Sequence, residues 1–560
     1  MKKNLSIVIL LISLAISQSV FSQIYSFEKG KVPEGWKIDK GVLHISSGKY
    51  KSGSRSLQIK WKQNAVLTIP SPTGISEACR NRNGGMNAWI YNESPTQENL
   101  LFSFRDETGK EVCQLPFLLN FKGWRCIWAK FQGDMNMPSK SNIQSVEIQF
   151  PQHTKKGVTY IDLLEFTPKV SWQNMSDAQY KVNRTDYSLI PDFIGYRNAT
   201  PKVEKVITAE DNQITTITDR LTTWYLGSEQ HSSERWIKMR TENEKTFIRN
   251  GVKAAQKIKI QYNEDYTPQG EPLFPMGAPT IIDGQEAKKF RTINENVLLP
   301  LALDYRKNKN DQSLKKALYI YDWFNDQGWA DGSSMGTLCF EKLRSSGYFH
   351  SFFLLKEQLS PEQLKRELQT MNWFTMFGAC YQLPSYAGEV ADNLRALAIP
   401  KLIYALSQND KQEREVALTA FKHYMDNALG IAPGFFGTFK ADFSGYHHRG
   451  PYHSAYYPHA LYAGALIAYL LHDTPYALSE TTLHNLKQGL LTFRFFCAGL
   501  DVPAGTVGRF PKGQQILETL LPAFVYTALS FKEPDKELTA AFKRILESTE
   551  NKQAIAEYIS

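Results

Sequence analysis

The residues best suited to chemistry gather in one stretch, 442–461, which reads DFSGYHHRGPYHSAYYPHAL. It holds four of the chain's 11 histidines and four tyrosines, with Arg449 among them. Imidazole is the usual general base near neutral pH, and a phenol readily donates a proton. A site that joins His, Tyr and Arg suits removal of a proton next to a carboxylate, as in β-elimination on a uronic acid.

The same stretch suits other kinds of site less well. Zinc-binding histidines usually stand one helical turn apart, whereas His447 and His448 are adjacent and His453 follows in a Gly-Pro loop. Glycoside hydrolysis needs two carboxylates across the bond, and the stretch offers Asp442 alone. Packing within a loop explains any single histidine, but it explains the whole cluster less well. No catalytic metal is therefore predicted.

Length and composition indicate a globular protein of two or more domains. The chain has 560 residues, of which 42% are hydrophobic and 22% charged, and this length exceeds one compact core. The net charge of +9 suits a polyanionic partner. Since no basic block or nucleic-acid motif occurs, the expected partner is an acidic polysaccharide and not nucleic acid.

The N-terminus predicts export. Residues 1–22 combine two lysines, an apolar run and small residues near the end, which is the pattern of a secretory signal peptide. No later run is apolar enough over a sufficient length to predict a membrane span. We therefore expect a secreted or periplasmic protein. Its six cysteines include no CxxC pair; Cys113 and Cys126 could pair, but buried free thiols are favoured.

The elements that must position the stretch fall into two classes. Residues 23–170 contain short runs of alternating apolar and polar residues between turn signals, which predicts a β-sandwich of jelly-roll type. Residues 171–190 form a polar linker. Residues 191–560 contain long segments with an apolar stripe of helical period, joined by long loops. The predicted fold is therefore multidomain α+β, with a sandwich followed by an incomplete α/α toroid whose loops line a substrate cleft.

Several segments form a distinctive set of motifs. They are YSFEKGKVPEGWKI and GSRSLQIKWKQ in the sandwich, and DQGWADGSSMGT, KADFSGYHHRGPYHSAYYPHAL, YLLHDTPYALSETTLHNLKQGL and GTVGRFP in the helical part. In combination rather than singly, these motifs resemble the chondroitin sulfate ABC lyases, a polysaccharide lyase family related to the chondroitin AC and hyaluronate lyases. The likeness covers nearly the whole mature chain.

The resemblance implies a site. Carried over by position, His448 is the catalytic base and Arg509 the catalytic arginine, and Asn393 falls near an asparagine that helps to bind the uronate carboxylate. The family's tyrosine stands seven residues after the histidine, where this chain has Ala455. Tyr456 and Tyr457 follow directly, and Tyr456 is favoured as the catalytic residue.

Two further departures from the family stand out. A histidine pair after GT is replaced by Leu338, Cys339 and Phe340. The chain also ends where the family continues into C-terminal β-domains, so these domains are expected to be missing, and a separate chain that carries them is a candidate partner.

The resulting interpretation is an exported glycosaminoglycan lyase that acts on chondroitin or dermatan sulfate, or hyaluronan, and leaves 4,5-unsaturated products. The alternatives are a catalytically impaired relative that binds acidic polysaccharide, and a glycoside hydrolase on an α/α toroid. No cofactor is required; a structural calcium in the N-terminal domain has no motif to support it. The residues predicted to bind substrate are Asn393, Trp373, Arg449, Tyr457 and His453.

Overall fold

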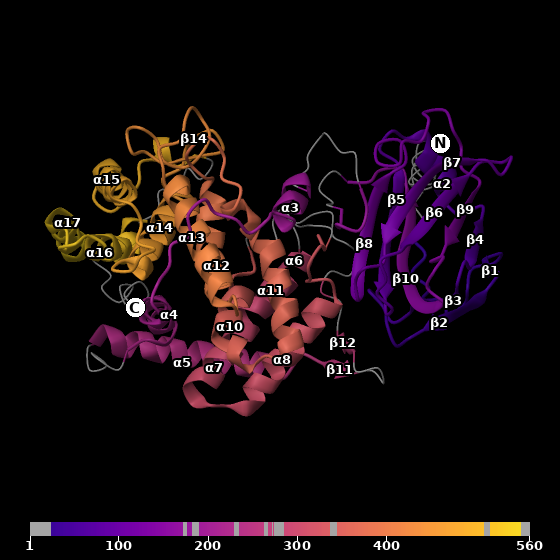
Figure 1. The fold of residues 1–560 in the computed structure, drawn as a ribbon, viewed down its shortest axis with the longest axis horizontal. Helices are drawn as coiled ribbons and strands as arrows, with labels where there is room; N and C mark the ends of the chain where they lie inside the picture. Colours follow the sequence, from indigo (N-terminus) through magenta and orange to yellow (C-terminus); the bar gives the residue numbers. More distant parts are fainter. Residues whose placement is uncertain are drawn as a thin grey trace, which may run out of the picture. The chain divides into compact units, whose positions relative to one another are not determined.

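The computed structural model describes most of the chain, and the described residues form two compact units (Figure 1). Unit 1 comprises 1–190, 260–287 and 323–338, and unit 2 comprises 191–259, 288–322 and 339–560. The predicted signal peptide and parts of the predicted linker lie outside the described residues. Those described are 24–171, 176–181, 190–228, 235–262, 267–270, 273, 285–335, 344–508 and 516–549.

Two five-stranded antiparallel sheets form most of unit 1. Their strand orders are β1-β4-β9-β6-β7 and β2-β3-β10-β5-β8. The strands are β1 (Lys37–Ile38), β2 (Gly41–Ser46), β3 (Ser56–Lys62), β4 (Val66–Pro70), β5 (Gly85–Asn92), β6 (Asn99–Arg105), β7 (Glu111–Leu118), β8 (Gly123–Lys130), β9 (Ser145–Gln149) and β10 (Lys156–Thr167). A short helix, α2 (Ile75–Arg80), precedes β5, and β11 (Ile260–Tyr262) pairs with β12 (Pro268–Gly270).

Alternation of side chains explains the shared core of the two sheets. In β3, Leu57, Ile59 and Trp61 are buried while Lys60 and Lys62 are exposed, because successive side chains of a strand point to opposite faces. Apolar residues from the inner faces of both sheets form one cluster. This confirms a sandwich-like pair of sheets, whereas the jelly-roll topology stays a prediction.

A second layer covers the outer face of β5, β8 and β10. Trp89, Trp124 and Tyr160 are buried there, and residues that follow in the sequence only much later pack against them. The hydroxyl of Tyr91 donates to Asp326 Oδ1 at 2.7 Å. The segment 323–335 thus belongs to unit 1, although it interrupts the helical part of the sequence.

Buried polar groups fasten this segment to the sheet. Lys51 is fully buried, its ammonium lies 4.2 Å from the Trp89 ring centroid, and it donates to the Gln327 carbonyl at 2.9 Å. Burial lowers the pKa of Lys51 to about 7. Asp177 accepts hydrogen bonds from the Ser334 backbone and hydroxyl, each at 2.7 Å. These bonds satisfy groups that would be costly to bury unpaired.

The cysteines of the described part are free, as the sequence favoured. Cys113 and Cys126 are both buried, and no disulfide joins them. Burial raises the pKa of the Cys113 thiol to about 12. Such thiols behave as small apolar side chains of the core.

Unit 2 is helical, which confirms the predicted change of character along the chain. Its helices are α3 (Ile190–Arg197), α4 (Asp211–Leu226), α5 (Arg235–Ala255), α6 (Gln285–Ile293), α7 (Leu299–Asn308), α8 (Asp311–Asp326), α10 (Ser346–Leu355), α11 (Pro361–Thr375), α12 (Ala391–Leu406), α13 (Lys411–Ala428), α14 (Tyr457–Leu471), α15 (Glu480–Phe496), α16 (Leu521–Leu529) and α17 (Lys536–Ser548). A π-helical turn, Asn294–Leu298, joins α6 to α7. The arrangement as a toroid stays a prediction. No helix among the described residues is long and apolar enough to cross a membrane.

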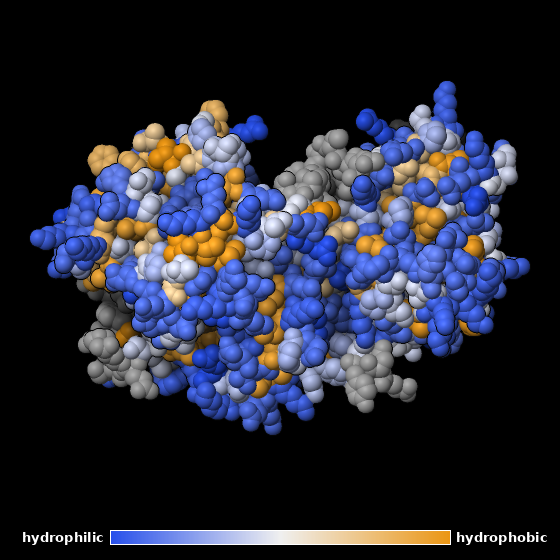
Figure 2. Space-filling view, in the orientation of Figure 1, coloured by the Kyte–Doolittle hydropathy of each residue, from blue (hydrophilic) through white to orange (hydrophobic). Residues whose placement is uncertain are grey.

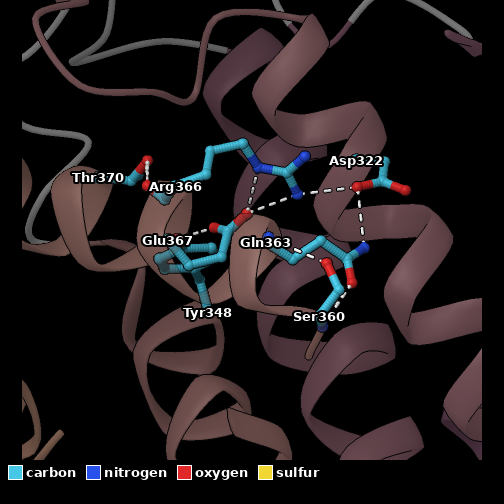
Figure 3. A network of polar contacts seen from close by, with 7 residues as sticks. All are labelled: Asp322, Tyr348, Ser360, Gln363, Arg366, Glu367 and Thr370. Atoms are coloured by element: carbon cyan, nitrogen blue, oxygen red, sulfur yellow. Dashed lines mark hydrogen bonds and ion pairs between the residues drawn. The ribbon is translucent and has the colours of Figure 1, made fainter. Parts of the chain in front are cut away.

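Helix α11 shows how local sequence sets these elements. Ser360 accepts from the Gln363 backbone while the Gln363 side chain accepts from the Ser360 backbone, which forms a capping box. Figure 3 shows the polar network on this helix: the Arg366 guanidinium contacts Glu367 at 2.8 Å and Asp322 at 2.8 Å. Tyr348 also donates to Glu367, whose side chain is 1% exposed. The network therefore joins α8, α10 and α11.

Replacing Arg366 should destabilise the protein markedly. Arg366→Met leaves the buried Glu367 without its cation, and breaking such a pair costs about 3 kcal/mol. The matched control is Lys411→Met, which removes an ion pair between the exposed side chains of Lys411 and Asp211 and should change stability little. Urea unfolding measures both variants, and equal unfolding midpoints would contradict the importance of the network.

Candidate active site

A tight hairpin carries the histidine pair. Strand β13 (Tyr446–His447) pairs with β14 (Gly450–Pro451), and His448 and Arg449 form the two-residue turn between them. Both turn residues have positive φ angles, 48° and 67°. A two-residue hairpin of type I′ requires this geometry and usually has Asn-Gly there. His and Arg adopt it at a cost of roughly 1–3 kcal/mol each, and strain of this kind concentrates at functional sites.

Asp392 holds the neighbouring basic side chains in place. It lies in the first turn of α12, where its Oδ1 accepts from Arg395 Nε at 2.7 Å and its Oδ2 lies 3.4 Å from His447 Nε2. Burial alone would raise the pKa of Asp392, but His447 and Arg395 outweigh burial and lower this pKa to about 2. The carboxylate is therefore charged at any physiological pH and orients both partners.

Tyr456 is the phenol that these basic groups surround. Its ring stacks on His447, with centroids 3.9 Å apart and planes inclined by 21°. The Arg395 guanidinium lies 5.7 Å from the Tyr456 centroid, and His448 meets the same ring edge-on at 5.7 Å. The arrangement therefore gathers a phenol, two imidazoles and a guanidinium in one cluster.

Tyr457, the other tyrosine at this place, belongs to the core. It is fully buried, and its hydroxyl donates to the Phe443 carbonyl at 2.7 Å. Gly445 makes room for its ring, because a Cβ there would lie 1.8 Å from the Tyr457 ring. Tyr457 thus supports the loop from below and has no exposed surface with which to contact a substrate.

His453 also supports the loop. It is 1% exposed, its Nε2 accepts from the Gly445 backbone at 3.1 Å, and its ring stacks on Phe496 with centroids 5.0 Å apart. Burial lowers the pKa of His453 to about 4, so the ring is neutral at pH 7. Its predicted contact with substrate conflicts with this burial.

An open pocket of ≈ 440 Å³ adjoins the hairpin, and we call it the hairpin pocket. Its lining residues are Val390, Asp392, Phe435, Phe436, Gly437, Tyr446, His447, His448 and Arg449. Phe435 is 69% exposed and Phe436 39%, and Figure 2 shows hydrophobic surface in this region, near the β14 label of Figure 1. Exposed aromatic rings beside polar groups are typical of a ligand-binding surface.

The remaining predicted residues lie in different places. Arg449 is exposed at the turn and lines the hairpin pocket. Asn393 is part-buried next to Asp392 and donates to Glu389 Oε1 at 3.2 Å. Trp373 of α11 is 1% exposed and packs on Phe193, so it faces the core instead of a subsite. Arg509 lies outside the described residues, as do Leu338, Cys339 and Phe340.

The loop before Arg509 is described, and it packs against the site. His453 N donates to the Thr506 carbonyl at 2.8 Å. Gly508 has a φ of +61°, and a Cβ there would lie 2.3 Å from the Tyr452 ring. Only glycine fits such a close approach with this backbone angle.

Sequence reasoning did not assign His447 or Asp392 to the site. The spacing of Asp392 and Arg395, three residues apart at a helix start, is a recognisable signal for an ion pair. Nothing local to either segment shows that this pair meets His447. No group of three or more His, Cys, Asp or Glu side chains that could hold a metal occurs in the described part of the chain.

Comparison with known proteins places the chain in a family. Residues 200–552 match the family described as "Lyase, catalytic", and residues 21–182 match "Lyase, N terminal". The chain thus contains both domains that these two family models describe. Together with its curated relatives, these matches show that it belongs to the chondroitin sulfate ABC lyase-like family.

Two curated relatives match along nearly the whole chain. The chondroitin sulfate ABC exolyase of Bacteroides thetaiotaomicron is 26% identical over 569 residues, which cover 94% of this chain and 53% of the relative. The chondroitin sulfate ABC endolyase of Proteus vulgaris is 24% identical over 581 residues, which cover 95% of this chain and 55% of the relative. The chain therefore spans about half the length of these relatives.

Solved structures of lyases are similar at greater distance. A Paenibacillus xanthan lyase is 13% identical with a TM-score of 0.49, over 62% of this chain and 32% of that one. A Streptomyces coelicolor chondroitin AC lyase is 11% identical with a TM-score of 0.46, over 61% of this chain and 46% of that one.

The buried His453 should make stability depend on acid pH. The pKa of His453 is about 4 in the folded protein and 6.5 ordinarily. Between these two pH values His453 is protonated in the unfolded chain but neutral in the folded protein. Stability from this group is therefore present above pH 6.5 and falls as the pH is lowered toward 4. His453→Gln, which keeps an acceptor for Gly445 N, should lose less stability than the wild type between about pH 7 and about pH 5. Urea midpoints at both pH values test this, and parallel losses would refute it.

Proposed function

We propose that the protein is an exported lyase that cleaves an acidic glycosaminoglycan by β-elimination at uronic acids. The observation that carries the proposal is the packing of His447, His448 and Arg395 around the Tyr456 phenol, beside the hairpin pocket. The relatives' names support chondroitin sulfate as substrate, and dermatan sulfate and hyaluronan are the other candidates.

The chemistry has three linked events. A base removes the C5 proton of the uronate, the electron pair forms the C4–C5 double bond, and the C4–oxygen bond breaks. The leaving oxygen then takes a proton from a general acid, so that the product carries a 4,5-unsaturated uronate. Because the C5 proton is weakly acidic, the carboxylate next to it must be neutralised by nearby positive charge.

Each side chain has a role suited to its place. His448, exposed at the strained turn, removes the C5 proton of one uronate epimer. Tyr456 removes it from the other epimer and donates a proton to the leaving oxygen. Arg449 on the turn neutralises the carboxylate, and Arg509 is proposed to steady the phenol on the strength of the family resemblance alone. His447 and Asp392 position Tyr456.

The exposed phenylalanines suit the rest of such a substrate. Phe436 packs edge-on against Tyr386 with centroids 4.9 Å apart. Lys440 holds this loop in shape, since its ammonium donates to the Gly434 carbonyl at 2.9 Å. The apolar faces of sugar rings pack well on aromatic rings held in this way.

Hydrolysis of a glycosidic bond is less well supported. It requires two carboxylates across the scissile bond. Asp392 is the one carboxylate among the residues that line the hairpin pocket, and it is engaged by Arg395 and His447. A carboxylate held in this way is poorly placed to act as acid or nucleophile.

The first test is ultraviolet absorbance during incubation with chondroitin sulfate, dermatan sulfate and hyaluronan in turn. The conjugated double bond of the product absorbs, so we expect absorbance to rise with at least one glycan. His448→Ala should lower kcat by about 10²-fold to 10⁴-fold, as removal of a general base does. His153→Ala, which alters an exposed histidine of unit 1, is the control and should leave the rate unchanged.

The outcome separates the alternatives. Binding of glycan without absorbance would support the impaired binding protein, and new reducing ends without absorbance would support the hydrolase. Full activity in His448→Ala would show that another residue is the base.

The two adjacent tyrosines allow a matched comparison. Tyr456→Phe removes the proposed acid and should lower kcat by about 10²-fold or more. Tyr457→Phe removes the buried hydrogen bond to Phe443 and should cost about 1 kcal/mol of stability while kcat stays near the wild-type value. Absorbance assays and urea unfolding of both variants are the measurements, and the reverse pattern would move the catalytic role to Tyr457.

A further inference from the structure

A second pocket lies among the helices of unit 2, and we call it the helix pocket. It has a volume of ≈ 340 Å³, and its polar lining residues include Arg291, Glu295, Ser346, His350, Arg395 and His459. These come from α6, the π-helical turn, α10, α12 and α14, of which α10, α12 and α14 pack against one another in that order (Figure 1). His459 belongs to the histidine-rich stretch 442–461, and Arg395 also binds Asp392 of the candidate active site.

The lining of the helix pocket favours an anion. Two guanidinium groups face a single carboxylate, Glu295. Burial lowers the pKa of both His350 and His459, so these two imidazoles add neutral hydrogen-bond donors. That carboxylate is already engaged, because it accepts from Arg291 Nε at 2.8 Å and from the Ser346 hydroxyl at 3.2 Å. The lining therefore has more hydrogen-bond donors than its own acceptors use, and oxyanions accept several such bonds at once.

His350 is the least explained of these donors. Its ring contacts Trp224 and Tyr225 with centroids 5.9 Å and 5.3 Å away, yet the described residues form no hydrogen bond with it. Burial lowers the pKa of His350 to about 4, since no neighbouring charge offsets the loss of water. His350 is half-buried and lines the helix pocket, so a ligand in this pocket can meet its ring.

Arg395 connects the helix pocket to the candidate active site. Its guanidinium binds Asp392 and lies over the Tyr456 ring, and the same side chain lines the helix pocket. A group bound in the helix pocket would therefore lie one side chain away from the reactive phenol. In a glycosaminoglycan, sulfate esters and carboxylates recur on adjoining sugars. Such a chain would suit one anion-binding position in the helix pocket and another at Arg449 of the candidate active site.

We propose that the helix pocket binds an oxyanion, a sulfate ester or a carboxylate, on the sugar that adjoins the cleaved uronate. The inference rests on the proposed function and adds to it a basis for selecting the substrate. Arg291, His350 and His459 hold the anion, and Ile399 and Pro400 of α12 give the sugar ring an apolar wall. An anion in the helix pocket would also interact with the Arg395 guanidinium. Because this guanidinium lies near the Tyr456 ring, binding of the anion would affect the surroundings of Tyr456.

Kinetics of His350→Gln and Arg291→Gln test the proposal. Neither residue is in the catalytic cluster, so we expect kcat to stay near the wild-type value while KM rises about 10-fold to 100-fold, as loss of a charge-assisted hydrogen bond predicts. A rise confined to chondroitin sulfate identifies a sulfate ester, and an equal rise with unsulfated hyaluronan identifies a carboxylate. An unchanged KM with both glycans in both variants overturns the proposal.

The controls are His44→Gln and Arg80→Gln, which alter exposed residues of unit 1 and should leave KM unchanged. Thermal unfolding of all variants shows whether each is folded. A change of KM in a variant whose unfolding midpoint equals that of the wild type cannot come from unfolding.

A readout without turnover separates this inference from the proposed function. Sodium sulfate should raise the pKa of His350 in the wild type, followed by NMR titration against sodium chloride of equal ionic strength, because a bound anion favours the charged imidazole. No shift with sulfate, and no loss of binding to a sulfated oligosaccharide in His350→Gln, would overturn the pocket assignment even if the enzyme proved active. Conversely, both effects in a protein without lyase activity would leave the anion site standing and reject the lyase.

Discussion

The Asp392 carboxylate is the interaction on which the candidate site depends. It fixes Arg395 through a short ion pair and meets His447 from the opposite side. With Asp392 in place, a guanidinium and an imidazole both lie against Tyr456. Burial would favour a neutral carboxyl, but its two basic partners keep it charged. A charged, oriented carboxylate of this kind preorganises the groups around a phenol, which is how enzymes stabilise charge that develops during reaction.

The loop near this carboxylate is held by contacts from several parts of unit 2. Tyr457 and His453 are buried beneath it; Gly445 permits the close approach of Tyr457 and donates its backbone N–H to His453. This packing offsets the strain of the two positive φ angles at His448 and Arg449. A strained turn persists only where the surrounding structure holds it in place. The buried aromatic side chains therefore help to keep the exposed His448 in its strained conformation.

Part of the fold follows from short-range patterns. Alternating residues such as those of β3 predict strands, and the capping box of α11 with its apolar stripe predicts a helix, since both depend on neighbours a few residues away. The return of 323–335 to the sheet of unit 1 has no such signal. It depends on Lys51 meeting Gln327 and Tyr91 meeting Asp326 across more than 200 residues of chain, and a periodic pattern carries no information about contacts of that range.

The sequence by itself determined the kinds of domain and the family, and it singled out the stretch proposed to hold the chemistry, because composition, periodicity and motif spacing are local properties of the chain. It also nominated His448 and the pair Tyr456 and Tyr457. Only the tertiary structure shows how the contacts of the two buried tyrosines differ: Tyr456 stacks on His447, whereas the hydroxyl of Tyr457 donates to the Phe443 carbonyl. The same holds for Trp373 and His453, whose types suit a sugar site but whose side chains pack in the core. Asp392 and His447 meet only because α12 and the hairpin, about 50 residues apart in the chain, fold against one another.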